Sequence, residues 1–303
     1  MPSVNTMTEE LNVEAVCRSF GERQVLRDVT FGVAAGRMTG FVGANGAGKT
    51  TMMRIILGVL AADSGSVTWR GARLDRGVRQ RFGYMPEERG LYPKMTVAEQ
   101  IVYLGRLHGL SAKAAHHNTS ALLDRLGVGD RAGDPVEKLS LGNQQRVQIA
   151  AALVHDPEVL ILDEPFSGLD PLAVDVVLGV LRERALSGAP VLFSSHQLEV
   201  VERLCDDLVI IADGSIRAAG RRADLRERHA LPRYRMEVAT DAGWLRDVPG
   251  VTLVDLDGAH AVFDLASGAD DQDVLRAALR RGPVRSFGAV TPSLAEIFRE
   301  VTR

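Results

Sequence analysis

The feature that most constrains this 303-residue chain is the run Gly43–Thr51, which reads GANGAGKTT. It fits the pattern G-x-x-x-x-G-K-[ST], follows the apolar residues Met38–Val42 and precedes the helix-compatible residues Thr51–Leu57. Glycines let such a loop wrap with its backbone N–H groups pointing inward, and the helix that follows adds the positive end of its dipole. The run therefore predicts an α/β fold in which a loop between a strand and a helix grips a polyphosphate.

Two side chains of this loop have predicted roles of their own. Lys49 would reach the β and γ phosphates, and Thr50 would offer its hydroxyl to Mg²⁺. The other predicted nucleotide contacts in the loop are Gly43, Asn45, Gly46, Ala47, Gly48 and Thr51. A glycine-rich turn that happens to hold a lysine is the alternative, which the strand-loop-helix setting disfavours. The loop alone does not distinguish a kinase, a GTPase, a recombinase or a transport ATPase.

A second run, Val159–Glu164, reads VLILDE and closes four apolar residues with two acids. Such a run predicts a strand buried on both faces of a parallel sheet, and ligands bind beyond the carboxyl ends of such strands. Beside the phosphate loop, Asp163 would hold the Mg²⁺ shell and Glu164 would polarise the attacking water. The alternative is a pair of acids that end a strand and face solvent.

The third run, Leu139–Arg146, reads LSLGNQQR and precedes a helix-forming stretch, so that Ser140 and Gly142 lie at a helix N-terminus. At this point the chain closely resembles the ATP-binding-cassette (ABC) ATPases, whose signature has the form LSxGxQ. The resemblance covers about residues 11–220. Further motifs match in the same order: the aromatic that stacks on adenine (Phe20), the Q-loop (Gly83–Glu87), the D-loop (Ser167–Asp170) and the switch histidine (His196).

The resemblance implies a P-loop fold with a RecA-like core, an antiparallel β subdomain and a helical subdomain. In ABC ATPases two copies pair head to tail, with ATP between the phosphate loop of one and the signature of the other. The resemblance therefore implies ATP and Mg²⁺ as cofactors. It also implies that Ser140, Gly142 and the D-loop residue Asp170 lie at a composite nucleotide site, which two copies form together. His196 would contact the γ-phosphate; without the ordered match, a lone histidine after an apolar strand would be interpreted as a core group.

The Q-loop departs from the family pattern, because it carries Glu87 where the family has glutamine. A carboxylate there could bind Mg²⁺ directly, but it also places negative charge near the γ-phosphate. The surrounding run Gly83–Tyr92, GYMPEERGLY, resembles export-type cassettes similar to sodium- and drug-extrusion ATPases. Leu141 stands where many relatives carry a second glycine, and the form LSxGNQQ is frequent in the same branch.

Residues of about 94–155 form the expected helical subdomain. Thr96 and Glu99 fit a capping box, and apolar residues recur at 97, 101, 104 and 107. In the family this subdomain receives the coupling helices of a membrane partner. We therefore expect a docking groove between it and the Q-loop.

The chain changes character after Gly220, so we predict a cassette over residues 1–220 and a small accessory domain over 221–303. Strand patterns at Tyr234–Val238, Val251–Val254, Ala261–Phe263 and Val284–Phe287 alternate with helical patterns at Gly243–Asp247, Asp271–Arg281 and Pro292–Val301. The order β-α-β-β-α-β-α predicts a ferredoxin-like α+β fold. A packing or dimer-stabilising role is favoured over a regulatory ligand-binding role.

Composition limits the partners. With 46% hydrophobic residues, 25% charged residues and a formal net charge of −3, the chain shows no basic field for nucleic acid. Cys17 and Cys205 lie far apart and form no CxxC, which favours a reducing cytoplasm. No apolar run reaches the roughly 18–20 residues that cross a bilayer, and residues 1–13 do not resemble a secretory signal. A membrane role would then come through a partner chain.

Together these patterns predict the ATP-hydrolysing subunit of an exporter, which pairs with itself on ATP and couples hydrolysis to a separate membrane permease for drug, antibiotic or sodium efflux. It would lie at the cytoplasmic face of the membrane, and we expect no nucleic-acid partner. The alternative is a non-transport cassette that acts on DNA or ribosomes, but such proteins generally carry two cassettes or a long coiled-coil insertion. A P-loop kinase would have no use for LSLGNQQR.

Overall fold

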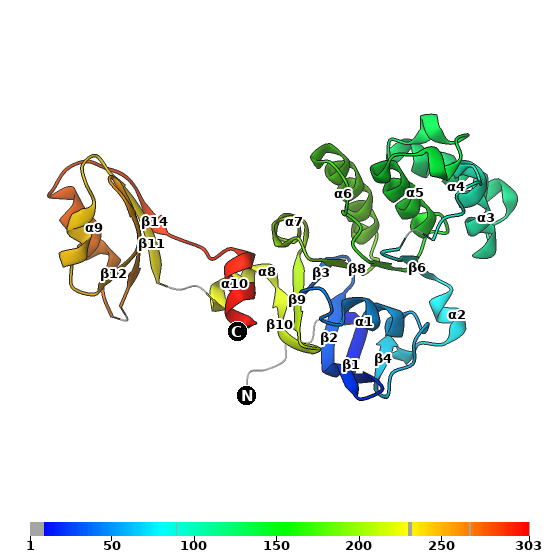
Figure 1. Ribbon diagram of the computed structural model, residues 1–303, viewed down its shortest axis with the longest axis horizontal. Helices are drawn as coiled ribbons and strands as arrows, with labels where there is room; N and C mark the ends of the chain where they lie inside the picture. Colours follow the sequence, from blue (N-terminus) through cyan, green and yellow to red (C-terminus); the bar gives the residue numbers. More distant parts are fainter. Residues whose placement is uncertain (1–8, 89, 230–231, 267, 303) are drawn as a thin grey trace. The chain divides into compact units, whose positions relative to one another are not determined.

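The computed structural model describes residues 9–88, 90–229, 232–266 and 268–302. These residues fall into two compact units that divide after Arg222. The prediction about the N-terminal segment falls largely on residues 1–8, and one Q-loop neighbour is Arg89; both lie outside the described residues. Figure 1 follows the elements along the chain.

A six-stranded sheet forms the centre of the first unit, in the order β10-β9-β3-β8-β7-β6. Its strands are β3 (Met38–Val42), β6 (Phe82–Met85), β7 (Val159–Leu162), β8 (Val191–Ser195), β9 (Asp207–Ala212) and β10 (Ser215–Arg221). All neighbours are parallel except β9 and β10, which form an antiparallel pair. Every residue of β3, β7 and β8 is buried, which fits their largely apolar sequences.

A four-stranded antiparallel sheet, in the order β2-β1-β4-β5, accompanies the central sheet. Its strands are β1 (Glu9–Phe20), β2 (Arg23–Ala34), β4 (Ser64–Trp69) and β5 (Ala72–Arg73). Helix α1 (Lys49–Ile56) joins the two sheets, because Met52 and Ile56 share one core cluster with Leu11 of β1 and Phe41 of β3. The short helix α2 (Arg76–Arg79) leads into β6.

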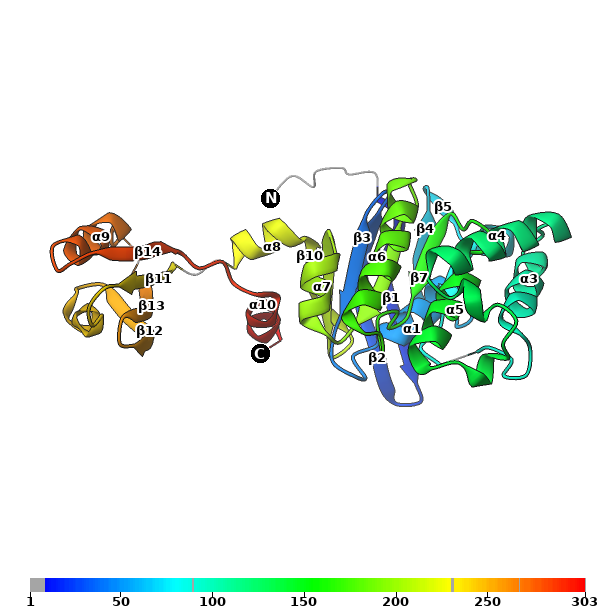
Figure 2. The same ribbon diagram turned by 90° about the horizontal axis from the view of Figure 1, so that it is seen from above.

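Helices form the remainder of this unit: α3 (Val97–Leu107), α4 (Ala112–Arg125), α5 (Leu141–Leu153), α6 (Pro171–Leu186) and α7 (Leu198–Leu204), with the 3₁₀ turns η1 (Gly129–Arg131) and η2 (Val136–Lys138). Figure 2 shows α3, α4 and α5 grouped at one end of the unit, as expected for a helical subdomain. The predicted capping box at Thr96 and Glu99 is confirmed, and its hydrogen bonds hold the pKa of the Glu99 carboxyl below its usual value. The predicted α/β fold with antiparallel and helical subdomains is thus confirmed.

The second unit contains a four-stranded antiparallel sheet in the order β12-β13-β11-β14. Its elements are α8 (Arg222–Arg228), β11 (Arg233–Val238), η3 (Gly243–Asp247), β12 (Val251–Asp257), β13 (His260–Leu265), α9 (Asp271–Leu279), β14 (Val284–Ala289) and α10 (Leu294–Val301). Helix α9 covers one face of the sheet (Figure 1), where Val274 packs with Met236 and Phe263. The strand order is that of the ferredoxin-like fold, as predicted, with a 3₁₀ helix at the first helical position.

In the described part of the chain, no helix has the length and hydropathy needed to span a membrane.

Candidate functional site

The predicted phosphate loop connects β3 to α1, and its glycines stand where a side chain would not fit. Gly46 and Gly48 have positive φ angles of 81° and 108°. A Cβ on Gly43 would lie 2.5 Å from the carbonyl oxygen of Ile211. Within the described residues, no side chain caps the N-terminus of α1. The first N–H groups of the helix are therefore open to an anion.

Lys49 is the first residue of α1 and is 8% exposed. Its Nζ donates to the carbonyl oxygens of Gly43, at 2.7 Å, and Ala44, at 3.3 Å. The cation is thus held within the loop by acceptors that a phosphate oxygen could replace.

A cavity of about 440 Å³ opens beside this loop. It is lined by Arg23, Val25, Asn45, Gly46, Gly48, Lys49, Thr50, Thr51, Glu87, Asp163 and Glu164. The loop and the two acids after β7 therefore face the same space, although more than 100 residues of sequence separate them. This arrangement offers cations and N–H groups for phosphates together with carboxylates for a divalent metal and a water molecule.

The two acids are almost fully buried: Asp163 is 1% exposed and Glu164 is 7% exposed. The hydroxyl of Ser194 donates to Asp163 Oδ1 at 2.5 Å and accepts the backbone N–H of Glu164 at 2.8 Å. The second oxygen, Asp163 Oδ2, is buried and has no hydrogen-bond partner among the described residues. Because an unsatisfied buried carboxylate oxygen is costly, this atom is suited to bind a cation, and a hard oxygen ligand suits Mg²⁺.

The described residues contain no cluster of three or more His, Cys, Asp and Glu side chains that could hold a metal ion. The predicted metal ligands Thr50, Asp163 and Glu87 all line the cavity, where oxygens of a bound nucleotide would add further ligands. Glu87 adds a second carboxylate to that of Asp163.

Both the side chain and the backbone carbonyl group of Glu164 form hydrogen bonds. Its Oε1 lies 2.9 Å from His196 Nδ1, and its carbonyl oxygen accepts a hydrogen bond from Gln145 Nε2 at 3.0 Å. Its φ angle is +53°, a left-handed conformation that is uncommon for a residue with a side chain. The structure thus brings His196 to Glu164, and the imidazole of His196 is half exposed.

Beyond the phosphate loop, the predicted nucleotide contacts Phe20, Ser140, Gly142 and Asp170 lie outside the cavity lining. Phe20 ends β1 and is 48% exposed, with the guanidinium carbon of Arg18 4.9 Å from its ring centroid. Ser140 caps α5 by accepting the N–H of Asn143 at 3.3 Å, and Asp170 caps α6. A Cβ on Gly142 would lie 3.4 Å from the carbonyl oxygen of Gly168, so the signature and the D-loop are neighbours within one chain.

Of the remaining loop residues, Gly43 contributes a carbonyl oxygen to Lys49, and Ala47 is 6% exposed and packs in the core. Neither lines the cavity.

Sequence reasoning missed several residues of this site. Arg23 and Val25 line the cavity from β2, and Arg23 is paired with Phe20 across the β1–β2 turn. The sequence signal for Arg23 was its position three residues after Phe20, the predicted adenine-stacking aromatic. Gln148 on α5 binds the Q-loop backbone, donating to the carbonyl oxygen of Pro86 at 2.7 Å; no sequence signal pointed to that contact.

A second cavity, of about 720 Å³, lies at the start of the helical subdomain. We call it the tyrosine groove, and it is lined by Tyr92, Pro93, Lys94, Met95, Tyr103 and Glu137. The side chains of Tyr92 and Tyr103 are substantially exposed. An exposed apolar surface of this kind is typical of a protein contact.

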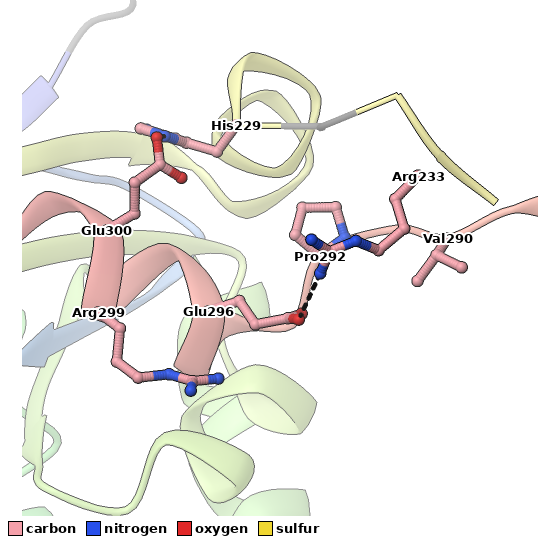
Figure 3. Close-up of a pocket in the computed structure, with 7 residues that line it drawn as sticks. All are labelled: His229, Arg233, Val290, Pro292, Glu296, Arg299 and Glu300. Carbon is pink, nitrogen blue, oxygen red and sulfur yellow. Dashed lines mark hydrogen bonds and ion pairs between the residues drawn. The ribbon is translucent and has the colours of Figure 1, made fainter. Parts of the chain in front are cut away.

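A cavity of about 430 Å³ in the second unit is lined by His229, Arg233, Val290, Pro292, Glu296, Arg299 and Glu300 (Figure 3). Arg233 forms two hydrogen bonds with Asp264, at 2.7 and 3.1 Å, and an ion pair with Glu296. His229 Nδ1 lies 3.2 Å from Glu300. These contacts tie α10 to the end of α8 and the start of β11, which is a structural role.

Comparisons with known proteins connect this geometry to a family. A family model described as "ABC transporter" matches residues 26–167, and one described as "ATP-binding protein DrrA1-3-like, C-terminal domain" matches residues 220–302. The ABC transporter ATP-binding protein YhaQ of Bacillus subtilis (strain 168) is 36% identical over 290 residues, covering 96% of this chain and 97% of that protein.

Two further relatives extend the comparison. The Nod factor export ATP-binding protein I of Burkholderia lata is 36% identical over 300 residues, covering 96% of this chain and 95% of that protein. A solved structure of an ATP-binding subunit of an ABC transporter is 35% identical, has a TM-score of 0.67, and covers 72% of this chain and 92% of that chain.

Proposed function

This chain belongs to the ATP-binding proteins of ABC transporters, in an export-type branch with a DrrA-like C-terminal domain, and from this premise we propose that it uses Mg²⁺ and ATP to drive a separate membrane permease. The observation that carries the proposal is the shared cavity of the phosphate loop and the two acids. The proposed cargo is a small molecule such as a drug or antibiotic, or sodium ions; the export named for the Burkholderia relative supports the direction of transport.

The proposed chemistry assigns one task to each group. Lys49 would exchange its carbonyl acceptors for phosphate oxygens, while Asp163 Oδ2 and Thr50 would hold Mg²⁺, which supplies charge neutralisation to the phosphates. Glu164 would accept a proton from the attacking water. His196 would keep that carboxylate in place and meet the γ-phosphate.

Lys49→Ala tests the nucleotide site directly. Removing a charge-assisted hydrogen bond to phosphate costs about 1.5–3 kcal/mol, which corresponds to roughly 10–100-fold weaker ATP binding. Titration with a fluorescent ATP analogue measures the change. Lys113→Ala, an exposed lysine on α4, is the matched control; undiminished affinity in Lys49→Ala would contradict the proposal.

We also propose that the site is completed by a second copy of the chain. Ser140, Gly142 and Asp170 lie outside the cavity of their own chain, and each is at or within the first turn of a helix. A helix N-terminus favours an anion. The signature of one protomer would therefore cover the γ-phosphate bound by its partner, and loss of that phosphate on hydrolysis would open the dimer.

The tyrosine groove is the proposed docking surface for the permease, which would place the protein at the cytoplasmic face of a membrane. The proposal is supported by the lining of the groove, which runs from Tyr92, after the Q-loop, to Tyr103 on α3. The second unit is proposed as an accessory domain over about residues 221–303, with a packing or dimer-stabilising role.

Affinity purification from detergent-solubilised membranes tests this partner. We expect the chain to recover a multi-helix membrane protein. Tyr103→Glu should not recover it, because the glutamate charge would be buried in an apolar interface. Leu186→Glu changes an exposed leucine at the end of α6 and is the control. Nuclease-sensitive recovery of nucleic acid or ribosomes would favour the non-transport alternative instead.

A further inference from the structure

We propose that Ser194 is a positioning residue for the ATPase site, whose single hydroxyl sets the orientation of both acids at the end of β7. The inference rests on the proposed function, since it assigns a metal-binding role to Asp163 and a role in water activation to Glu164.

Sheet register places Ser194 against these acids. In the parallel pair β7–β8, Leu162 is opposite Phe193. The residue after each of these is Asp163 in one segment and Ser194 in the other, so these two residues are also neighbours. Ser194 is fully buried. Its Oγ lies 2.5 Å from Asp163 Oδ1 and 2.8 Å from the backbone nitrogen of Glu164.

The directions of both hydrogen bonds are fixed by chemistry. A backbone N–H can only donate, so the Ser194 oxygen accepts from Glu164. An ionised carboxylate can only accept, so the one hydroxyl proton of Ser194 goes to Asp163 Oδ1. The hydroxyl is therefore committed to both residues at once, and no other side chain makes these two contacts in the described part of the chain.

This arrangement has a consequence for each acid. Because one oxygen of Asp163 is held by Ser194, the carboxylate is rotated so that Oδ2 stays buried without a partner, ready to bind a cation. Hydrogen bonds to metal-binding carboxylates orient them in this way, and their loss typically costs about 10–100-fold in metal affinity. For Glu164, the bond to its N–H supports the left-handed backbone at φ +53°, which directs the side chain to His196.

The test compares variants that keep and lose the hydroxyl. Ser194→Ala removes both hydrogen bonds, whereas Ser194→Thr keeps a hydroxyl at the same position. Ser195→Ala is the matched control, because Ser195 follows on the same strand, is 3% exposed and uses its oxygen for the N–H of Gln197 instead. The readout is Mn²⁺ affinity, measured by electron paramagnetic resonance of the full chain with a non-hydrolysable ATP analogue.

We expect Ser194→Ala to bind Mn²⁺ about 10–100-fold more weakly, while the affinity for the analogue in the presence of EDTA stays within about 2-fold. Ser194→Thr and Ser195→Ala should bind Mn²⁺ like the wild-type chain. Wild-type Mn²⁺ affinity in Ser194→Ala would overturn the inference, as would an equal loss in Ser195→Ala or an equal loss of metal-free nucleotide binding.

Two outcomes are separated by the design. If the wild-type chain itself binds no Mn²⁺ with the analogue, the proposed function fails; if it binds and Ser194→Ala binds equally, only this inference fails. Ser194→Val, which has the shape of threonine without its hydroxyl, repeats the comparison if alanine does not fold. Misfolding of both hydroxyl-free variants beside a folded Ser194→Thr would assign Ser194 to stability and overturn the positioning role.

Discussion

Glu164 is a single residue on which the proposed chemistry depends, and its contacts make a clean substitution possible. Glutamine has the same shape as glutamate, and its amide oxygen can keep the contact with His196, but it is not a general base. We therefore expect Glu164→Gln to bind ATP within about 2-fold of wild type and to turn over roughly 10²–10⁴-fold more slowly. Steady-state phosphate release measures the turnover, and fluorescent-nucleotide titration measures the affinity for ATP.

The control for this substitution is Glu183→Gln, which removes an exposed carboxylate on α6 outside the cavity. It should leave turnover unchanged. Turnover of Glu164→Gln equal to that of the wild type would remove Glu164 from the role of base and leave water activation to another group.

Single residues could be predicted from sequence where the chemistry is local. Lys49 belongs to a contiguous motif, and Asp163 and Glu164 are adjacent in the chain. We predicted that these residues meet at one cavity because ligands bind beyond the carboxyl ends of parallel strands. Ser194 could not be found in this way, because its partners are about 30 residues away and depend on the register of β7 and β8. The roles of Phe20 and of the other predicted contacts stay predictions.

At the scale of elements, a stacked histidine pair links α3, α5 and β6. The rings of His108, at the end of α3, and His155, just after α5, lie 3.6 Å apart, and His155 Nε2 hydrogen-bonds to the carbonyl oxygen of Phe82 at 3.2 Å. Burial, followed by the charge of His108, lowers the pKa of His155 to about 4. In the unfolded chain a histidine titrates near 6.5.

The sign of the pH dependence follows from this difference. Between pH 6.5 and about 4 the unfolded chain takes up a proton at His155 that the folded chain excludes, so protonation stabilises the unfolded state. The contribution of His155 to the free energy of unfolding is fully present above pH 6.5, where its imidazole is neutral in the folded and the unfolded chain. This contribution is lost as the pH falls to about 4. By pH 5 we expect a loss of about 1–2 kcal/mol, discounted for partial solvent exposure.

His155→Gln should flatten this dependence, because glutamine can donate to the Phe82 carbonyl oxygen without titrating. Urea unfolding at pH 7 and pH 5 measures the free energy of unfolding of each variant. His116→Gln, on the exposed side of α4, controls for the loss of a histidine elsewhere. A pH dependence of His155→Gln as steep as that of wild type would contradict the assignment.

Elements were predictable where one periodicity or one cap decides them. The capping box predicted the start of α3 at Thr96, and the apolar runs predicted β3 and β7. Contacts between elements were not predictable, because they depend on surfaces that are distant in sequence. The tie between Gln148 of α5 and the carbonyl oxygen of Pro86 is an example.

At the scale of the whole molecule, the proposed function requires a second chain to complete the nucleotide site. The cavity supplies the phosphate loop and both acids, while Ser140 caps a helix outside it. The sequence contains the motifs of both halves of the proposed composite site, but the pairing of those halves depends on contacts between two chains and not on sequence order. A second protomer is the proposed partner.

Ser140→Arg tests this arrangement, because it removes an N-cap and adds a bulky cation where the partner's γ-phosphate would sit. Losing the cap costs about 1 kcal/mol in helix stability. Ser111→Arg matches that cost, since Ser111 caps α4 through the N–H of Ala114 at 3.2 Å and is exposed. Any difference between the two variants therefore reports the position of Ser140 and not the loss of a cap.

In the Glu164→Gln background, where ATP is not consumed, light scattering with MgATP should show dimers for Ser111→Arg and monomers for Ser140→Arg. Both variants should bind nucleotide as monomers, because the cavity lies within one chain. Mixing Ser140→Arg with Lys49→Ala gives a sharper result: a head-to-tail pair can then keep one intact composite site, built from the loop of the first variant and the signature of the second. Dimers of Ser140→Arg alone, as abundant as those of Ser111→Arg, would mean that the signature does not contact the nucleotide of a partner.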